Sequence, residues 1–196
     1  MARKVIWLDT ETTGLDCKSH AMIQFAALIE INEQVVEEIN LFFRPMTGQA
    51  IDATALKINK RKVPEIMEFP HQAVSLESLK KTLAKYVKKR DPADKFIVAG
   101  KNAGAFDVGF IRQTFLNNDD PYYGSWFFNC VRDVEALVAQ AVLFRGLRPK
   151  NFKLGTLCSL YGVQLGNSAH NALSDVRATR DLYYAIAVHI RTGVKI

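Results

Sequence analysis

The sequence predicts an α/β protein with a mixed five-stranded sheet and helices on both faces of the sheet. Three extended apolar segments come first and are separated by short turns, which is the pattern of antiparallel strands. Two short, continuous apolar runs then alternate with helical patterns, as expected of buried strands flanked by helices. The strands are expected at residues 5–8, 22–31, 35–44, 96–100 and 127–131.

The ends of the first three strands are marked by turn residues. A Thr-Thr-Gly turn interrupts the first apolar run at residues 12–14. A tight turn at residues 32–34 joins the second and third strands, and Pro45 ends the third because proline has no amide hydrogen for a strand ladder. These three strands are expected to form the antiparallel part of the sheet.

Helices are expected between and after the strands. Asp52 caps a short helix that reaches Lys57, and an irregular basic stretch follows at residues 60–64. Apolar residues at helical spacing predict a helix that opens at Ser75 and stops at Asp91. Four more helices are expected: one that reaches residue 115, and others at 133–144, 154–161 and 172–190.

Composition and charge restrict the class of protein. The chain has 196 residues, 48% hydrophobic and 23% charged, so one domain with a buried core is expected over residues 1–196. No apolar run approaches the roughly 18 residues of a membrane span, and the opening residues lack a signal-peptide core. Three widely spaced cysteines predict neither disulfides nor a zinc site, and favour a reducing, cytoplasmic location. The net charge of +6 suits a polyanionic partner.

Two carboxylates near the N-terminus form the first candidate site. Asp9 and Glu11 follow the first apolar run and are two residues apart, so both side chains can point to the same face of the sheet. Their repulsion would raise one pKa unless a divalent cation with oxygen ligands neutralises them. Taken alone, the pair favours an edge strand that leads into a solvated acidic turn.

Two further aspartates are expected at the starts of helices. Asp107 comes shortly after the buried strand at 96–100, and Asp175 lies in the first turn of the last helix, five residues after His170. An aspartate at such a position is also stabilised by capping and by the helix dipole. Neither residue indicates catalysis without the other.

The acidic segments together resemble a known set of motifs. They read Asp9-Thr10-Glu11-Thr12-Thr13-Gly14, Asn102-Ala103-Gly104-Ala105-Phe106-Asp107 and His170-Asn171-Ala172-Leu173-Ser174-Asp175. Their order and separations resemble the three motifs of the DEDDh (DnaQ-like) 3′–5′ exonuclease family, which includes the proofreading epsilon subunit of bacterial DNA polymerase III. The likeness covers nearly the whole chain and implies a ribonuclease H-like fold.

The resemblance implies a two-metal-ion mechanism. Phosphodiester hydrolysis needs an attacking hydroxide and neutralisation of the charge that builds on phosphorus and on the leaving oxygen, and two Mg²⁺ or Mn²⁺ ions about 3.5–4 Å apart can supply these. In the family pattern Asp9 would bridge both ions, and Asp107 would hold the second ion through water. Glu11 and Asp175 would complete the site that activates water, and His170 would take the proton.

Six further residues are candidates for substrate binding, namely Thr12, Gly14, Leu15, Asn59, Asn102 and Phe106. Gly14 would let the backbone approach the terminal nucleotide, and Leu15 could wedge against the last base or anchor its own turn. Asn102 could bond the nucleotide or tie its loop, and Phe106 could pack on the sugar or in the core. Asn59 stands where the family commonly has a histidine, so a phosphate or sugar bond without a titratable group is expected there.

The expected function is that of a metal-dependent 3′–5′ exonuclease that releases nucleoside 5′-monophosphates from single-stranded DNA. An exoribonuclease with the same chemistry is the first alternative, and a non-catalytic nucleic-acid-binding or polymerase-accessory module is the second. The expected cofactors are two divalent metal ions, Mg²⁺ or Mn²⁺. The expected partners are single-stranded 3′ ends and a separate polymerase or replication protein, with no membrane.

Overall fold

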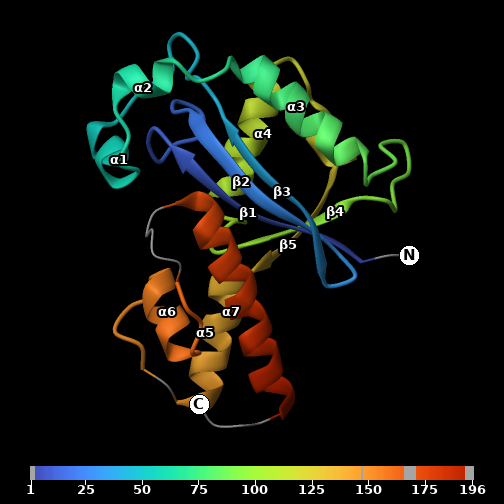
Figure 1. The fold of residues 1–196 in the computed structure, drawn as a ribbon, viewed down its shortest axis with the longest axis vertical. Helices are drawn as coiled ribbons and strands as arrows, with labels where there is room; N and C mark the ends of the chain where they lie inside the picture. The colour runs from blue at the N-terminus through green and yellow to red at the C-terminus, as the bar shows by residue number, and fades with distance from the viewer. Residues whose placement is uncertain (1–2, 147, 166–170, 193–196) are drawn as a thin grey trace.

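A mixed five-stranded sheet lies between two layers of helices in the computed structural model, which describes residues 3–146, 148–165 and 171–192 (Figure 1). The strands are β1 (Lys4–Thr12), β2 (Met22–Ile31), β3 (Gln34–Phe42), β4 (Phe96–Gly100) and β5 (Phe127–Asp133). Their order is β3-β2-β1-β4-β5, with β1, β2 and β3 antiparallel and with β4 parallel to both β1 and β5. The predicted sheet is confirmed.

The helices cover both faces of the sheet, as predicted. One layer holds α3 (Gln72–Ala84) and α4 (Asp107–Asn117), and the other holds α5 (Val134–Arg145), α6 (Leu154–Leu160) and α7 (Ala172–Thr192) (Figure 1). Two short helices, α1 (Ala53–Ile58) and α2 (Val63–Met67), lie beside the end of the sheet where β1 finishes. A 3-10 turn over Tyr122–Ser125 leads into β5. No helix within the described ranges is both long and apolar enough to span a membrane.

The central strand β1 contributes to both hydrophobic cores. Ile6 and Leu8 pack in the core under α3 and α4, whereas Val5 and Trp7 pack in the core under α5, α6 and α7. Side chains alternate along a strand, so the odd-numbered residues of β1 face α7. Asp9 and Glu11, which continue this series, are therefore carried to the α7 side of the sheet.

The predicted start and the predicted end of α3 both need correction. α3 begins at Gln72 instead of Ser75 and ends at Ala84 instead of Asp91. Ser75 lies inside the helix, where its hydroxyl donates a 2.6 Å hydrogen bond to the Phe42 carbonyl of β3, so it ties helix to sheet and does not cap. The chain after Ala84 turns back because Asp94 accepts a 2.9 Å bond from the Lys88 amide.

The basic stretch at residues 60–64 is also more regular than predicted. Its last two residues are the first two of α2, with Pro64 in the first turn, where a missing amide hydrogen costs no helical bond. The capping prediction before it is confirmed: Asp52 is the N-cap of α1, and its Oδ1 accepts a 2.6 Å bond from the Thr54 amide.

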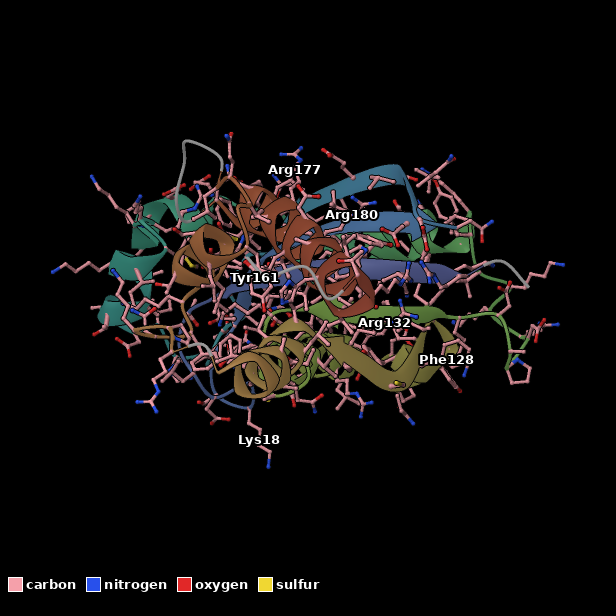
Figure 2. The ribbon with its side chains drawn as sticks, turned by 90° about the horizontal axis from the view of Figure 1, so that it is seen from below. Lys18, Phe128, Arg132, Tyr161, Arg177 and Arg180 are labelled. Atoms are coloured by element: carbon pink, nitrogen blue, oxygen red, sulfur yellow. The ribbon has the colours of Figure 1, made fainter. Side chains whose placement is uncertain are left out.

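A buried carboxylate fastens α7 to the sheet. Glu30 of β2 is fully buried and accepts hydrogen bonds from Trp7 Nε1 at 3.1 Å, Arg180 Nε at 2.7 Å and the Tyr184 hydroxyl at 2.7 Å. A buried charge is tolerated only when it is paired and hydrogen-bonded in this way. Figure 2 shows Arg180 and its neighbour Arg177 leaving α7 on the side of β2 and β3. These contacts hold the helix, and with it Asp175, against β1.

Candidate active site

The ends of β1 and β4 and the first turns of α4 and α7 meet at one cavity of about 700 Å³. In Figure 1 the upper, N-terminal end of α7 lies against the sheet at this place. Three of the four predicted acidic residues line the cavity: Asp9 from β1, Asp107 from α4 and Asp175 from α7. The described lining is completed by Thr10, Lys101, Asn102, Phe106, Lys153, Leu154, Gly155, Thr156, Leu165 and Thr179.

Glu11 belongs to the same electrostatic group. The pKa of Glu11 is raised to about 7, first by burial and then by the charges of Asp175 and Asp107, while the charge of Arg61 opposes the rise. The pKa of Asp9 is raised well above its usual range by burial first, and then by the charges of Asp107, Glu11 and Asp175. The four predicted carboxylates therefore repel one another across a short distance in a desolvated site.

Asp107 links α4 to β1. It is 3% exposed, and its Oδ1 accepts hydrogen bonds from the Thr10 amide at 2.8 Å and the Thr10 hydroxyl at 2.6 Å. Burial raises the pKa of Asp107 to about 6, while the two bonds from Thr10 act in the opposite direction. One oxygen of this carboxylate is thus engaged by the strand that carries Asp9 and Glu11.

The donor set has the chemistry of a site for hard divalent cations. Carboxylate oxygens are the ligands that Mg²⁺ and Mn²⁺ prefer, and mutual repulsion of buried carboxylates is relieved by a cation. Within the part of the chain that the structure describes, no three His, Cys, Asp or Glu side chains stand in an arrangement that would hold a metal ion. The residues therefore fit such ions in donor type and electrostatics, and their side chains are not drawn together around one point.

The third motif is described from Asn171 onwards. Asp175 lies in the first turn of α7, as predicted, and its amide bonds to the Asn171 carbonyl at 3.0 Å. His170 lies outside the described residues, so its role as proton acceptor stays a prediction.

Two of the six predicted substrate-binding residues line the cavity. Asn102 has a left-handed backbone conformation with φ of +59°, and its amide donates to Asp133 Oδ1 at 3.1 Å, which ties the loop after β4 to the start of α5. Phe106 packs against Phe110, with ring centroids 5.0 Å apart, while its side chain also borders the cavity. The Asn102 backbone thus ties its loop and the Phe106 ring packs on Phe110, while the contacts of both residues with a nucleotide stay a prediction.

The other four lie outside this lining, around the turn that follows β1. The Thr12 hydroxyl is buried and donates to the Gly14 carbonyl at 2.7 Å, and the Asn59 amide donates to the Thr12 carbonyl at 2.8 Å. A Cβ on Gly14 would lie 2.0 Å from the His20 ring, so glycine makes room for this imidazole. Leu15 is 83% exposed.

Lys101 and Arg61 are cationic residues near the site that were not predicted as site residues, and Lys153 of the cavity lining is another. Lys101 lines the cavity directly before the second motif. Arg61 acts on Glu11 from the basic stretch after α1, where its guanidinium lies over the rings of Phe42 and Phe69 at 5.2 and 5.7 Å. The only sequence signal for either is its position, next to a motif or within a basic stretch.

Comparison with known proteins decides the family. The model of the RNase T family, which is described as an exonuclease family, matches residues 6–183. The chain belongs to this exonuclease family. The resemblance to DnaQ-like 3′–5′ exonucleases that the motifs suggested is thereby confirmed.

Curated relatives match most of this exonuclease domain at low identity. The PolC-type DNA polymerase III of Ureaplasma parvum serovar 3 is 26% identical over 178 residues, which are 89% of this chain and 11% of that polymerase. Ribonuclease T of Haemophilus ducreyi is 21% identical over 193 residues, which are 94% of this chain and 85% of that protein. The chain thus spans about a tenth of the first relative and most of the second.

Solved structures show the same fold. Exonuclease I of E. coli in complex with a dT13 oligonucleotide matches with a TM-score of 0.73 and 22% identity, over 97% of this chain and 42% of that one. The apo form of Exonuclease I gives a TM-score of 0.76, over 96% of this chain and 42% of that one. At this identity the likeness concerns the fold alone, and it confirms the expected ribonuclease H-like fold.

Proposed function

We propose that residues 1–196 form one exonuclease domain that removes nucleoside 5′-monophosphates from the 3′ end of single-stranded DNA, with two divalent metal ions, Mg²⁺ or Mn²⁺, as cofactors. The observation that carries this proposal is that Asp9, Asp107 and Asp175 line one cavity, with Glu11 in electrostatic contact with the same group, and that burial raises the pKa values of Asp9, Glu11 and Asp107. A buried acidic group of this kind costs free energy in a protein that does not bind cations.

The roles of the residues follow from their elements. Asp9 and Glu11 would hold the metal ions from the α7 face of β1, Asp175 would do so from α7, and Asp107 from α4. Bound ions would supply an activated water and neutralise charge on the phosphate. His170 would accept the proton of the attacking water. Asn102 and Phe106 would contact the terminal nucleotide, because both reach the cavity.

The predicted substrate-binding residues around the turn after β1 would contact the nucleotide from outside the cavity lining. The exposed side chain of Leu15 is available to pack on the terminal base, and the absence of a side chain on Gly14 leaves room for the His20 ring and would let the backbone approach the nucleotide. Thr12 and Asn59 would act through the backbone of the turn, which their hydrogen bonds hold in place. These roles of the four residues are part of the proposed function.

The relatives support two substrates. A complex of Exonuclease I with dT13 favours single-stranded DNA, and a zinc-bound form of the same enzyme with single-stranded DNA agrees with a metal-dependent reaction. Ribonuclease T favours RNA, so an exoribonuclease with the same chemistry is the second candidate. The PolC-type relative supports a polymerase partner, and three free cysteines support a reducing, cytoplasmic location.

One assay tests the proposal. Strands of DNA and RNA with matched sequence, labelled at the 5′ end, are incubated with Mg²⁺ or with EDTA. A descending ladder on DNA that EDTA suppresses is expected. Faster shortening of RNA would select the second candidate, and a circular strand cut as fast as a linear one would exclude an exonuclease.

A further inference from the structure

A lysine at the active-site cavity suggests a substrate contact outside the three motifs. Lys101 follows β4 directly and lines the cavity together with Asp9, Asp107 and Asp175. Among the described residues that line this cavity, Lys101 and Lys153 are the two that carry positive charge. The charge of Lys101 acts on Asp9, where it opposes the rise in pKa.

The ion pair that Lys101 forms is a weak interaction. Its Nζ forms an ion pair with Glu135 in the first turn of α5, and the two side chains are 24% and 36% exposed. An ion pair that remains in contact with water adds little to stability, so a better anion can replace Glu135.

A nucleic-acid 3′ end supplies the better anion. The terminal phosphodiester brings negative charge next to four carboxylates, and lysine is a common point-charge ligand for phosphate oxygens. We propose that Lys101 leaves Glu135 to bind a non-bridging oxygen of the 3′-terminal phosphodiester. This inference rests on the proposed function and adds a residue to it.

Four variants separate phosphate binding from a structural ion pair. Lys101→Met removes the contact, Lys101→Arg keeps the charge, and Glu135→Gln breaks the pair while it leaves the lysine. Lys95→Met is the matched control, since it removes the same charge at the opposite end of β4, roughly 20 Å away along the strand. Lys95 lines a different cleft, with Arg3 and Lys4.

Two readouts are measured for each variant. The first is kcat/KM on a single-stranded oligonucleotide, and the second is the slope of log affinity against log salt, measured with EDTA so that the strand stays intact. Lys101→Met should lower kcat/KM by about 10–100-fold, the range for a lost hydrogen bond to a charged group, and should flatten the salt slope by about 0.7. Lys101→Arg should retain most of the activity, and Glu135→Gln and Lys95→Met should keep both readouts close to wild type.

The outcomes are separable. Equal losses of activity and of melting temperature in Lys101→Met and Glu135→Gln, with an unchanged salt slope, would show that the ion pair is structural and overturn the inference. If the wild-type protein is active and Lys101→Met has the same kcat/KM and salt slope as Lys95→Met, the inference is also overturned. Wild-type protein that shortens no DNA or RNA strand would instead refute the proposed function itself.

Discussion

At Asp9, burial and repulsion act together on one carboxyl group. Its pKa is raised well above the usual range by burial and by three neighbouring carboxylates, and Lys101 offsets part of the rise. Burial and the three neighbouring carboxylates disfavour the charged form of Asp9. The ionised residue therefore lowers the stability of the metal-free protein. An asparagine of the same shape would remove the repulsion and also a cation ligand.

We expect Asp9→Asn to abolish turnover and weaken Mn²⁺ binding, and to leave the melting temperature in metal-free buffer equal to or higher than that of the wild type. Calorimetry with Mn²⁺ and thermal unfolding with EDTA measure these effects. Asp16→Asn is the control, because Asp16 is exposed and bonds to Lys18 and Ser19 in its own turn. Wild-type activity with unchanged Mn²⁺ affinity in Asp9→Asn would remove Asp9 from the site.

The third motif allows a comparison of two roles five residues apart. If His170 takes the proton and Asp175 holds a metal ion, His170→Ala should leave Mn²⁺ affinity nearly intact and lower the chemical rate by about 10²–10⁴-fold, the usual contribution of a general base. Asp175→Asn should lower both. Single-turnover rates in saturating Mg²⁺ measure the difference, and a His170→Ala variant that cleaves at the wild-type rate would exclude His170 as the base.

At the scale of elements, α7 is the part whose placement decides the geometry of the site. It carries Asp175 across the face of β1 that holds Asp9 and Glu11, and the buried Glu30 fixes its position through Arg180 and Tyr184. Nearby, Arg177 forms a second ion pair with Glu38 of β3, with the two side chains 50% and 44% exposed. Two arginines on one helix thus make a buried and an exposed ion pair with the same sheet.

Arg180→Met and Arg177→Met should therefore differ strongly in stability. Removal of Arg180 leaves a buried carboxylate without its cation, which typically costs about 3–5 kcal/mol, and the bonds from Trp7 and Tyr184 place the expected loss near the lower end. Removal of Arg177 should cost at most about 1 kcal/mol. Urea unfolding of both variants measures the difference, and equal losses would show that Glu30 does not anchor α7.

The strands and most helices could be predicted because their signals are local. Apolar runs and period-two alternation located the five strands, and the alternation placed Asp9 and Glu11 on one face. The start of α3 was missed because Ser75 resembles a cap in sequence, whereas its hydroxyl bonds to Phe42, distant in sequence. Contacts made only on folding carry no local signal.

The same limit applies to the site. The order of the motifs identified the acidic residues, but Lys101 and Arg61 depend on tertiary partners. Lys101 pairs with Glu135 on α5, and the guanidinium of Arg61 lies over the rings of Phe42 and Phe69. The sequence places a lysine and an arginine at these positions, and only the fold shows that the charge of Lys101 acts on Asp9 and that of Arg61 on Glu11.

At the scale of the whole molecule, a basic protein surrounds an acidic site. The net charge of +6 favours nucleic acid, while the local carboxylates repel it and attract cations. This contrast makes the stability of the metal-free protein depend on pH. Glu11 is the clearest case, because its pKa rises from 4.5 to about 7 on folding.

A raised carboxyl pKa means that the folded protein binds the proton more tightly than the unfolded chain. Below pH 4.5 both forms are protonated and Glu11 has no effect; between pH 4.5 and about 7 the unfolded chain loses the proton first, so stability falls as pH rises. Above pH 7 the loss is complete, at about 3 kcal/mol.

We expect the stability of wild type relative to Glu11→Gln, measured by urea unfolding with EDTA, to decrease across this window, and Mn²⁺ to restore it in the wild type. The comparison with Glu11→Gln cancels the histidines and surface carboxylates that both proteins share. A stability difference that does not change from pH 5 to 7 would show that folding does not raise the pKa of Glu11. A difference that Mn²⁺ leaves unchanged would show that the metal does not stabilise the ionised Glu11.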